Sequence, residues 1–125
     1  MKVQGEWTLE GFFADRPRSR ELFEHIRSFI GSLGPMKIEV MNTQISFGTK
    51  RKFAWIWLPQ KWIKKREEGS ITLTFALLRR IDDLRIEEAV EPRPGRWTHH
   101  IIIRNESDLD EKVEGWVREA YDLSL

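Results

Sequence analysis

The 125-residue chain contains no cysteine. Its absence excludes disulfide bonds, thiol catalysis and every zinc or iron–sulfur site that needs cysteine ligands. The chain also lacks an apolar run near the ~18 residues of a membrane span, and residues 1–6 lack the apolar stretch of a signal peptide. These absences lead us to expect a cytoplasmic protein with no membrane partner.

Motifs for catalysis are also missing. The chain has no Gly-x-Ser-x-Gly elbow, no Walker loop and no Gly-x-Gly-x-x-Gly turn. We therefore predict no catalytic residues and no cofactor, and we expect a protein that is not an enzyme.

The side chains that could bind a metal are poorly arranged for it. His99 and His100 are adjacent on a predicted strand, so they point to opposite faces, and no two histidines have His-x₃-His spacing. We interpret His99 as a half-buried histidine held by a hydrogen bond. Asp108, Asp110 and Glu111 fall in a predicted first helical turn, where the helix dipole favours acids. We therefore predict no metal site.

What the chain does contain is sufficient for one hydrophobic core. Apolar residues make up 40% and charged residues 33% of the sequence, and the length suits one domain over residues 1–125. Helical spacing predicts one turn near residues 7–13 with Thr8 as its cap, a helix over 19–33 ended by Gly34-Pro35, and a last helix capped by Ser107. The predicted buried stripes of the two long helices are Leu22, Ile26, Phe29 and Leu33, then Leu109, Val113, Trp116 and Ala120.

Between these helices the apolar period changes to two. It predicts strands over 36–40, 44–47, 52–58, 71–77 and 96–104. Residues 82–90 are interpreted as one helical turn, and 91–95 as a loop. In the third strand we expect one face to carry Phe53, Trp55 and Trp57, and the other to carry Ala54, Ile56 and Leu58. We interpret five tryptophans as mostly core: Trp7, Trp55, Trp57, Trp97 and Trp116.

The order helix, strands, helix predicts the fold class. About five consecutive strands with no crossover helix between them indicate an antiparallel sheet and an α+β fold. Each long helix has one apolar stripe, so the N-terminal and C-terminal helices are expected to pack side by side on one sheet face. The other face is expected to carry Thr72, Thr74, Thr98 and His100, with Ala54 and Ile56.

Charge is distributed unevenly, although the net charge is only +1. Residues 42–66 contain seven basic side chains and no acid, whereas residues 106–125 contain seven acids and two bases. The basic stretch should attract anions, and an exposed tryptophan beside it could stack on a base. The alternative is a solvated basic hairpin that balances an acidic helix. The candidate anion-binding residues are Lys50, Arg51, Lys52, Lys61, Trp62, Lys64, Lys65, Arg66 and Arg96.

Some segments resemble a small bacterial family of domains of unknown function. The similarity rests on Phe53-Ala54-Trp55, Pro59-Gln60-Lys61, Gly95-Arg96-Trp97-Thr98-His99 and Ala120-Tyr121. That family is distantly similar to the frataxin-like α+β sandwich and to small proteins proposed as iron chaperones. The resemblance implies a fold and no settled activity. Iron binding in the frataxin-like fold uses an acid-rich first helix, whereas this one carries Arg18, Arg20 and Arg27.

Three functional hypotheses follow. The first is a non-enzymatic binding or accessory domain for an anionic partner, with nucleic acid as the first candidate. The second is a homo-oligomeric interaction module, such as a homodimer, that buries the strand around Ile56 and its tryptophans against another copy. The third is a frataxin-like carrier of a small ligand or metal. Salt dependence, oligomeric mass and metal titration distinguish them.

Overall fold

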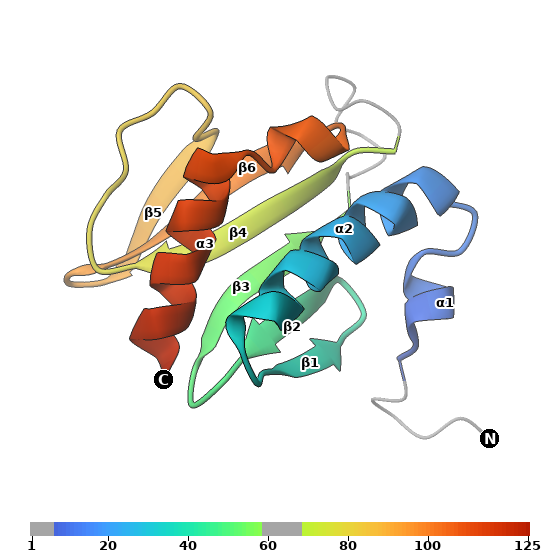
Figure 1. Cartoon of the computed structure of the whole chain (residues 1–125), viewed down its shortest axis with the longest axis horizontal. Helices are drawn as coiled ribbons and strands as arrows, with labels where there is room; N and C mark the ends of the chain where they lie inside the picture. Colours follow the sequence, from blue (N-terminus) through green and yellow to red (C-terminus); the bar gives the residue numbers. More distant parts are fainter. Residues whose placement is uncertain (1–6, 59–68) are drawn as a thin grey trace.

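A computed structural model describes residues 7–58 and 69–125 (Figure 1). Its strands form one antiparallel sheet of six, in the order β1-β2-β3-β4-β6-β5. The helices α2 and α3 lie together on one face of this sheet, so the predicted α+β class and helix layer are confirmed. The elements are α1 (Leu9–Phe12), α2 (Pro17–Leu33), β1 (Lys37–Val40), β2 (Gln44–Gly48), β3 (Lys52–Trp57), β4 (Ile71–Leu77), β5 (Glu88–Arg93), β6 (Arg96–Ile103), the 3₁₀ turn η1 (Glu106–Asp108) and α3 (Glu111–Ser124).

The N-terminal elements form where local signals predict them. The Thr8 hydroxyl accepts a hydrogen bond from the Gly11 amide at 3.0 Å and caps α1. Helix α2 begins at Pro17, whose ring suits a first helical turn, and ends before Gly34. Leu22 and Ile26 are fully buried beneath α2, and Phe29 and Leu33 are half-buried at the rim of its stripe.

Strand pairing assigns each side chain to one face of the sheet. Directly opposed residues of antiparallel strands share a face. Ala54 pairs with Phe75, and Ile56 pairs with Leu73, so both point to the helix face and are fully buried. The expectation that Ala54 and Ile56 lie on the open face is therefore wrong. The open face instead carries Trp55 and Trp57 with Thr72, Thr74, Thr98 and His100.

A β-bulge explains why the faces of β3 were misassigned in part. Phe47 pairs with Ala54 and Gly48 pairs with Lys52, so Phe53 is an extra residue without a partner on β2. At such a bulge two consecutive side chains point to the same side. Phe53 and Ala54 are both buried, and the Phe53 ring meets the Tyr121 ring of α3 edge-on at 5.4 Å. Strict alternation cannot reveal a bulge, because a bulge interrupts the period of two.

Strand β5 was missed by sequence reasoning. Residues interpreted as a helical turn and a loop instead pair with β6, with Glu88 opposite His100 and Val90 opposite Thr98. The strand contains Pro92 and lies at the sheet edge, which is where proline is tolerated in a sheet. Because most of its side chains are exposed, β5 lacks the alternating apolar pattern that identifies a strand.

The start of the last helix also differs from expectation. Asp110, not Ser107, is its N-cap, because the Asp110 carboxylate accepts a hydrogen bond from the Val113 amide at 3.0 Å. Ser107 lies in the preceding turn η1, which Asn105 caps. The predicted stripe is confirmed, since Leu109, Val113 and Ala120 are buried against the sheet. Among the described residues, no helix is long and apolar enough to span a bilayer.

Candidate anion-binding site at one end of the sheet

Two basic segments meet at one end of the sheet. Strands β3 and β6 are each antiparallel to β4, so both begin at the same end. Lys52 is the first residue of β3, and Arg96 is the first residue of β6. Since neighbouring strands lie about 4.8 Å apart, the two strand starts are separated by only about 10 Å. The β2–β3 turn and the β5–β6 turn therefore form one surface, although 44 residues separate Lys52 from Arg96.

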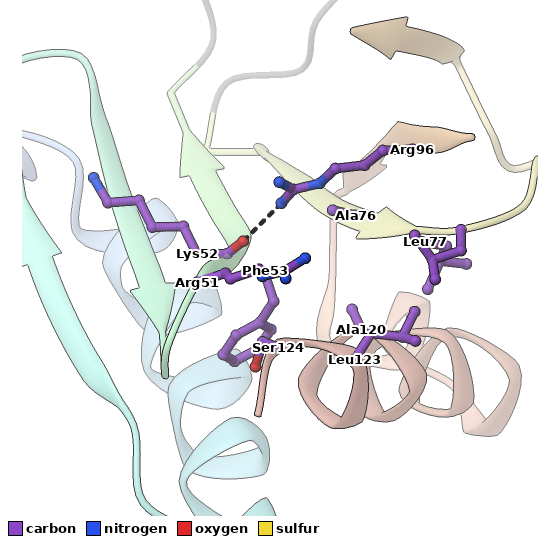
Figure 2. Close-up of a pocket in the computed structure, with 10 residues that line it drawn as sticks. Arg51, Lys52, Phe53, Ala76, Leu77, Arg96, Ala120, Leu123 and Ser124 are labelled. Carbon is purple, nitrogen blue, oxygen red and sulfur yellow. Dashed lines mark hydrogen bonds between the residues drawn. The ribbon is translucent and has the colours of Figure 1, made fainter. Parts of the chain in front are cut away.

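Arg96 connects the two strands across β4. Its Nη2 donates a hydrogen bond to the Lys52 carbonyl oxygen at 3.0 Å (Figure 2). The pairing with Thr98 places Ala76 of β4 on the same face, between Lys52 and Arg96. The small Ala76 side chain leaves room for the guanidinium, and Ala76 is only 6% exposed. The backbone contact holds Arg96 in place, while the guanidinium keeps further donors for an acceptor outside the protein.

The positive charges here repel one another. Burial lowers the pKa of Arg96, and the nearby charges of Arg93 and Arg51 lower it further. Arg96 stays protonated, because the guanidinium of arginine is not deprotonated in proteins. None of these three arginines has an ion-pair partner within the described part of the chain, and neither does Lys50. An anion bound here would relieve their repulsion.

Three arginines elsewhere are paired with acids. Arg79 binds the Glu119 carboxylate with two hydrogen bonds, and Arg85 pairs with Asp83 and Asp110. Arg20 lies within ion-pair distance of two glutamates. Of Lys50, Arg51, Lys52, Arg93 and Arg96, Lys52 alone has such a partner among the described residues, Glu39 of β1 at 3.5 Å. The other four therefore form a cluster of unpaired cations, unlike the three paired arginines.

A small cleft opens beside Arg96, where β3 and β4 separate. Their pairing stops at Ala54 and Phe75, and the last turns of α3 line the gap from the helix side (Figure 2). Its volume is about 50 Å³, against the roughly 300–1,000 Å³ of ordinary small-molecule sites. The cleft cannot enclose a nucleotide or a similar metabolite. It lies next to the C-terminal end of α3, and Leu123 and Ser124 are part of its lining.

The structure brings together four of the predicted site residues. Lys50, Arg51 and Lys52 lie in and beside the β2–β3 turn, and Arg96 faces them across β4. Arg96 lies at the Lys52 end of β3. The remaining candidates lie outside the described residues: Lys61, Trp62, Lys64, Lys65 and Arg66.

Two features of the site were missed. Arg93 joins the cationic group because it pairs with Arg96 across the β5–β6 turn, and the unrecognised strand β5 hid this contact. The second feature is a row of hydrogen bonds on the open face, from Trp57 through Thr74 to His100. Alternation of residues 72, 74, 98 and 100 predicts the polar face, but only strand order brings these side chains into contact.

His99 and Asp83 have structural roles. His99 is fully buried rather than half-buried, and its Nε2 accepts a hydrogen bond from the Ile81 amide at 2.9 Å. Hydrogen bonds from the Arg85 amide and from Lys112 lower the pKa of Asp83 to about 2. Within residues 7–58 and 69–125, no three histidine or acidic side chains come together as a metal site would require.

Comparison with known proteins identifies a family. Residues 9–124 match the family described as a domain of unknown function (DUF5655). The chain belongs to this family. The match spans most of the chain, including both turns of the cationic surface, and confirms the resemblance to a family of unknown function. No curated protein and no solved structure matches the chain significantly.

Proposed function

We propose that this DUF5655 domain is a non-enzymatic binding or accessory domain that holds an anionic partner at the Lys52 and Arg96 end of its sheet, and that the partner is a nucleic acid. One observation carries the proposal: Arg51, Arg93 and Arg96 gather without ion-pair partners in the described structure. Like charges placed together raise the free energy of the unbound protein, and a phosphate backbone would offset that repulsion.

The size of the cleft favours a large partner over a metabolite. A volume of about 50 Å³ corresponds to one or two water molecules, at roughly 30 Å³ each. The cations lie on exposed turns around it, as Arg51 and Arg93 are both exposed. An extended polyanion can contact both turns at once, whereas a small anion would reach only part of the surface. The net charge of +1 predicts modest, salt-sensitive affinity.

The test is the affinity for labelled DNA and RNA oligonucleotides, followed by fluorescence anisotropy at roughly 50 and 200 mM salt. We expect more than tenfold weaker binding at the higher salt, because about three neutralised phosphates give a logarithmic salt slope of about −2. Replacing Arg51 and Arg93 with alanine (R51A/R93A) should weaken binding roughly tenfold at low salt and reduce the slope by about one to two.

A matched variant controls for total charge. R16A/R118A also removes two arginines that have no ion-pair partner in the described structure, but at sites on the helices. It should bind like the wild type. Absence of wild-type binding at low salt would overturn the proposal, as would equal losses in the two double variants.

A further inference from the structure

The open face of the sheet continues from the cationic end into an aromatic surface. Pairing places Trp55 opposite Thr74 and Trp57 opposite Thr72, on the side away from α2 and α3. Both tryptophans are half-buried, so part of each side chain remains accessible. Their positions contrast with Trp116, which is 6% exposed and stacks on Phe75 beneath α3.

A hydrogen-bonded row holds one of these indoles in place. The Trp57 Nε1 donates to the Thr74 hydroxyl at 3.0 Å, and that hydroxyl lies 2.7 Å from His100 Nδ1. Thr74 accepts from Trp57, so it can donate its own proton to His100 Nδ1. This arrangement favours the neutral His100 tautomer that carries its proton on Nε2. The ring plane of Trp57 and the donor direction of His100 are thus set before any ligand binds.

His100 presents this donor at the open face. Its side chain is 25% exposed, and Nε2 lies 3.9 Å from a Glu88 carboxylate oxygen, longer than a hydrogen bond. The row therefore combines an oriented aromatic ring with an oriented donor.

The cations and the aromatic rings share this face. Lys52 is paired with Gly48 beyond the bulge, and its side chain reaches Glu39, which lies on the open face of β1. Arg96 alternates with Trp97, so it also lies on the open face. From Lys52 to Trp57 the strand extends about 16 Å, at ~3.3 Å per residue. A nucleotide strand whose phosphate backbone lies at the cations and whose bases extend over the tryptophans matches this order.

From this arrangement, which rests on the proposed nucleic-acid function, we infer that the ligand is single-stranded nucleic acid, with bases stacked on Trp55 and Trp57 and phosphates at Arg96 and Arg51. Stacking needs a base that is free of its duplex partner. Sheets that present aromatic side chains in this way hold about two or three bases, and tolerate sequence because every base has a π face.

The test compares three labelled ligands on the whole protein: an oligothymidylate of about ten nucleotides, an abasic oligomer of the same length, and a duplex of that length. The abasic strand keeps the phosphates and lacks the bases. We expect the oligothymidylate to bind at least fivefold more tightly than either of the other ligands, because one stacked base contributes about five- to hundredfold in affinity.

The variant Trp55→Leu tests whether bases stack on Trp55. Leucine retains apolar bulk but offers no ring, so this variant should bind oligothymidylate about tenfold more weakly while its affinity for the abasic strand stays unchanged. Trp7→Leu is the matched control, because Trp7 is 43% exposed and precedes α1. It should bind all three ligands like the wild type.

The outcomes separate this inference from the function on which it rests. Equal wild-type affinity for the abasic strand and the oligothymidylate would overturn base stacking, and so would preference for the duplex, while leaving phosphate binding intact. Absence of binding to all three would overturn both. The wild-type comparison needs no variant, so the inference remains testable even if Trp55→Leu fails to fold.

Discussion

Two adjacent histidines show how the position of one residue decides its role. His99 points into the helix layer, stacks on Phe75 at a ring distance of 5.1 Å, and anchors the loop at Ile81. His100 points the other way and contacts Thr74 on the open face. Their side chains are chemically identical, but only His100 can meet a partner. The buried one instead makes stability depend on pH.

Protonation of His99 should destabilise the fold. Burial, with a smaller contribution from the charge of Arg79, lowers its pKa below the usual 6.5. The unfolded chain therefore binds the proton at a higher pH than the folded one does. Stability is highest above about pH 7 and falls as pH decreases from the unfolded pKa through the folded one. Urea unfolding midpoints measured between about pH 5 and pH 8 test this.

His99→Gln is the informative variant for that prediction. The glutamine oxygen can still accept from the Ile81 amide, but it does not titrate. We expect a loss of roughly 1–3 kcal/mol at pH 8 and a shallower decline toward pH 5 than in the wild type. The same decline in both proteins would show that His99 does not control the acid sensitivity.

At the scale of the element, one contact connects the end of α2 to α3. Gly34 has a positive φ of 146°, and a Cβ there would lie 2.4 Å from the Tyr121 hydroxyl oxygen. The same hydroxyl donates a hydrogen bond to the Pro35 carbonyl at 3.0 Å. The turn after α2 therefore requires glycine for its backbone conformation and for the close approach of Tyr121.

Gly34→Ala should destabilise the protein by about 2 kcal/mol or more, since it strains the backbone and displaces Tyr121. Tyr121→Phe alone should cost about 1 kcal/mol through the lost hydrogen bond. In the double variant the nearest contact disappears, so the loss should be smaller than the sum, which denaturant unfolding of all four proteins would reveal. Strict additivity would contradict the contact.

Gly31→Ala, inside α2, is the control for Gly34→Ala. A Cβ at Gly31 meets nothing within 4 Å, and Gly31 is exposed on α2. This substitution should be neutral or stabilise the protein by about 0.5–1 kcal/mol, because alanine loses less backbone entropy than glycine in a helix.

Across the whole molecule, the layers imply a gradient of local stability. Strand β4 has a hydrogen-bonded neighbour on each side and contacts both α2 and α3. Strand β1 has four residues at one edge, and β5 is mostly exposed at the other. The centre of the sheet therefore opens only when most of the fold opens.

Native-state hydrogen exchange should follow this gradient. We expect the amides of β4 to exchange last, with free energies close to that of global unfolding, and those of β5 to exchange at least a hundredfold faster. If the amides of β5 exchanged as slowly as those of β4, the prediction that this edge strand is only weakly stabilised would be wrong.

Charge is also organised over the whole molecule. Charges at the start of α3 are partly balanced, since Arg85 pairs with Asp110 and Lys112 lies 3.0 Å from Asp83. A cluster of cations without ion-pair partners in the described structure lies around the other end of that helix, where Arg51 and Arg96 line a cleft with Ser124. A net charge of +1 therefore conceals an uneven distribution of charge.

Local sequence patterns were sufficient to predict most elements and the α+β class. Helical spacing in α2 and alternation in β4 and β6 depend only on neighbours along the chain, and each of these patterns correctly identified the buried face. The basic character of the β2–β3 turn was equally clear from the sequence, because composition does not depend on which residues are in contact. Prediction failed where the local pattern was weak, as in the exposed strand β5 and at the Asp110 cap of α3.

Contacts between distant residues depend on how the strands pair. The bulge turns Phe53 inward and leaves Trp55 and Trp57 on the open face, and its position depends on the pairing of β2 with β3. Lys52 and Arg96 share one end because β3 and β6 both run antiparallel to β4. Such contacts join residues far apart in sequence, so periodicity and composition carry no record of them.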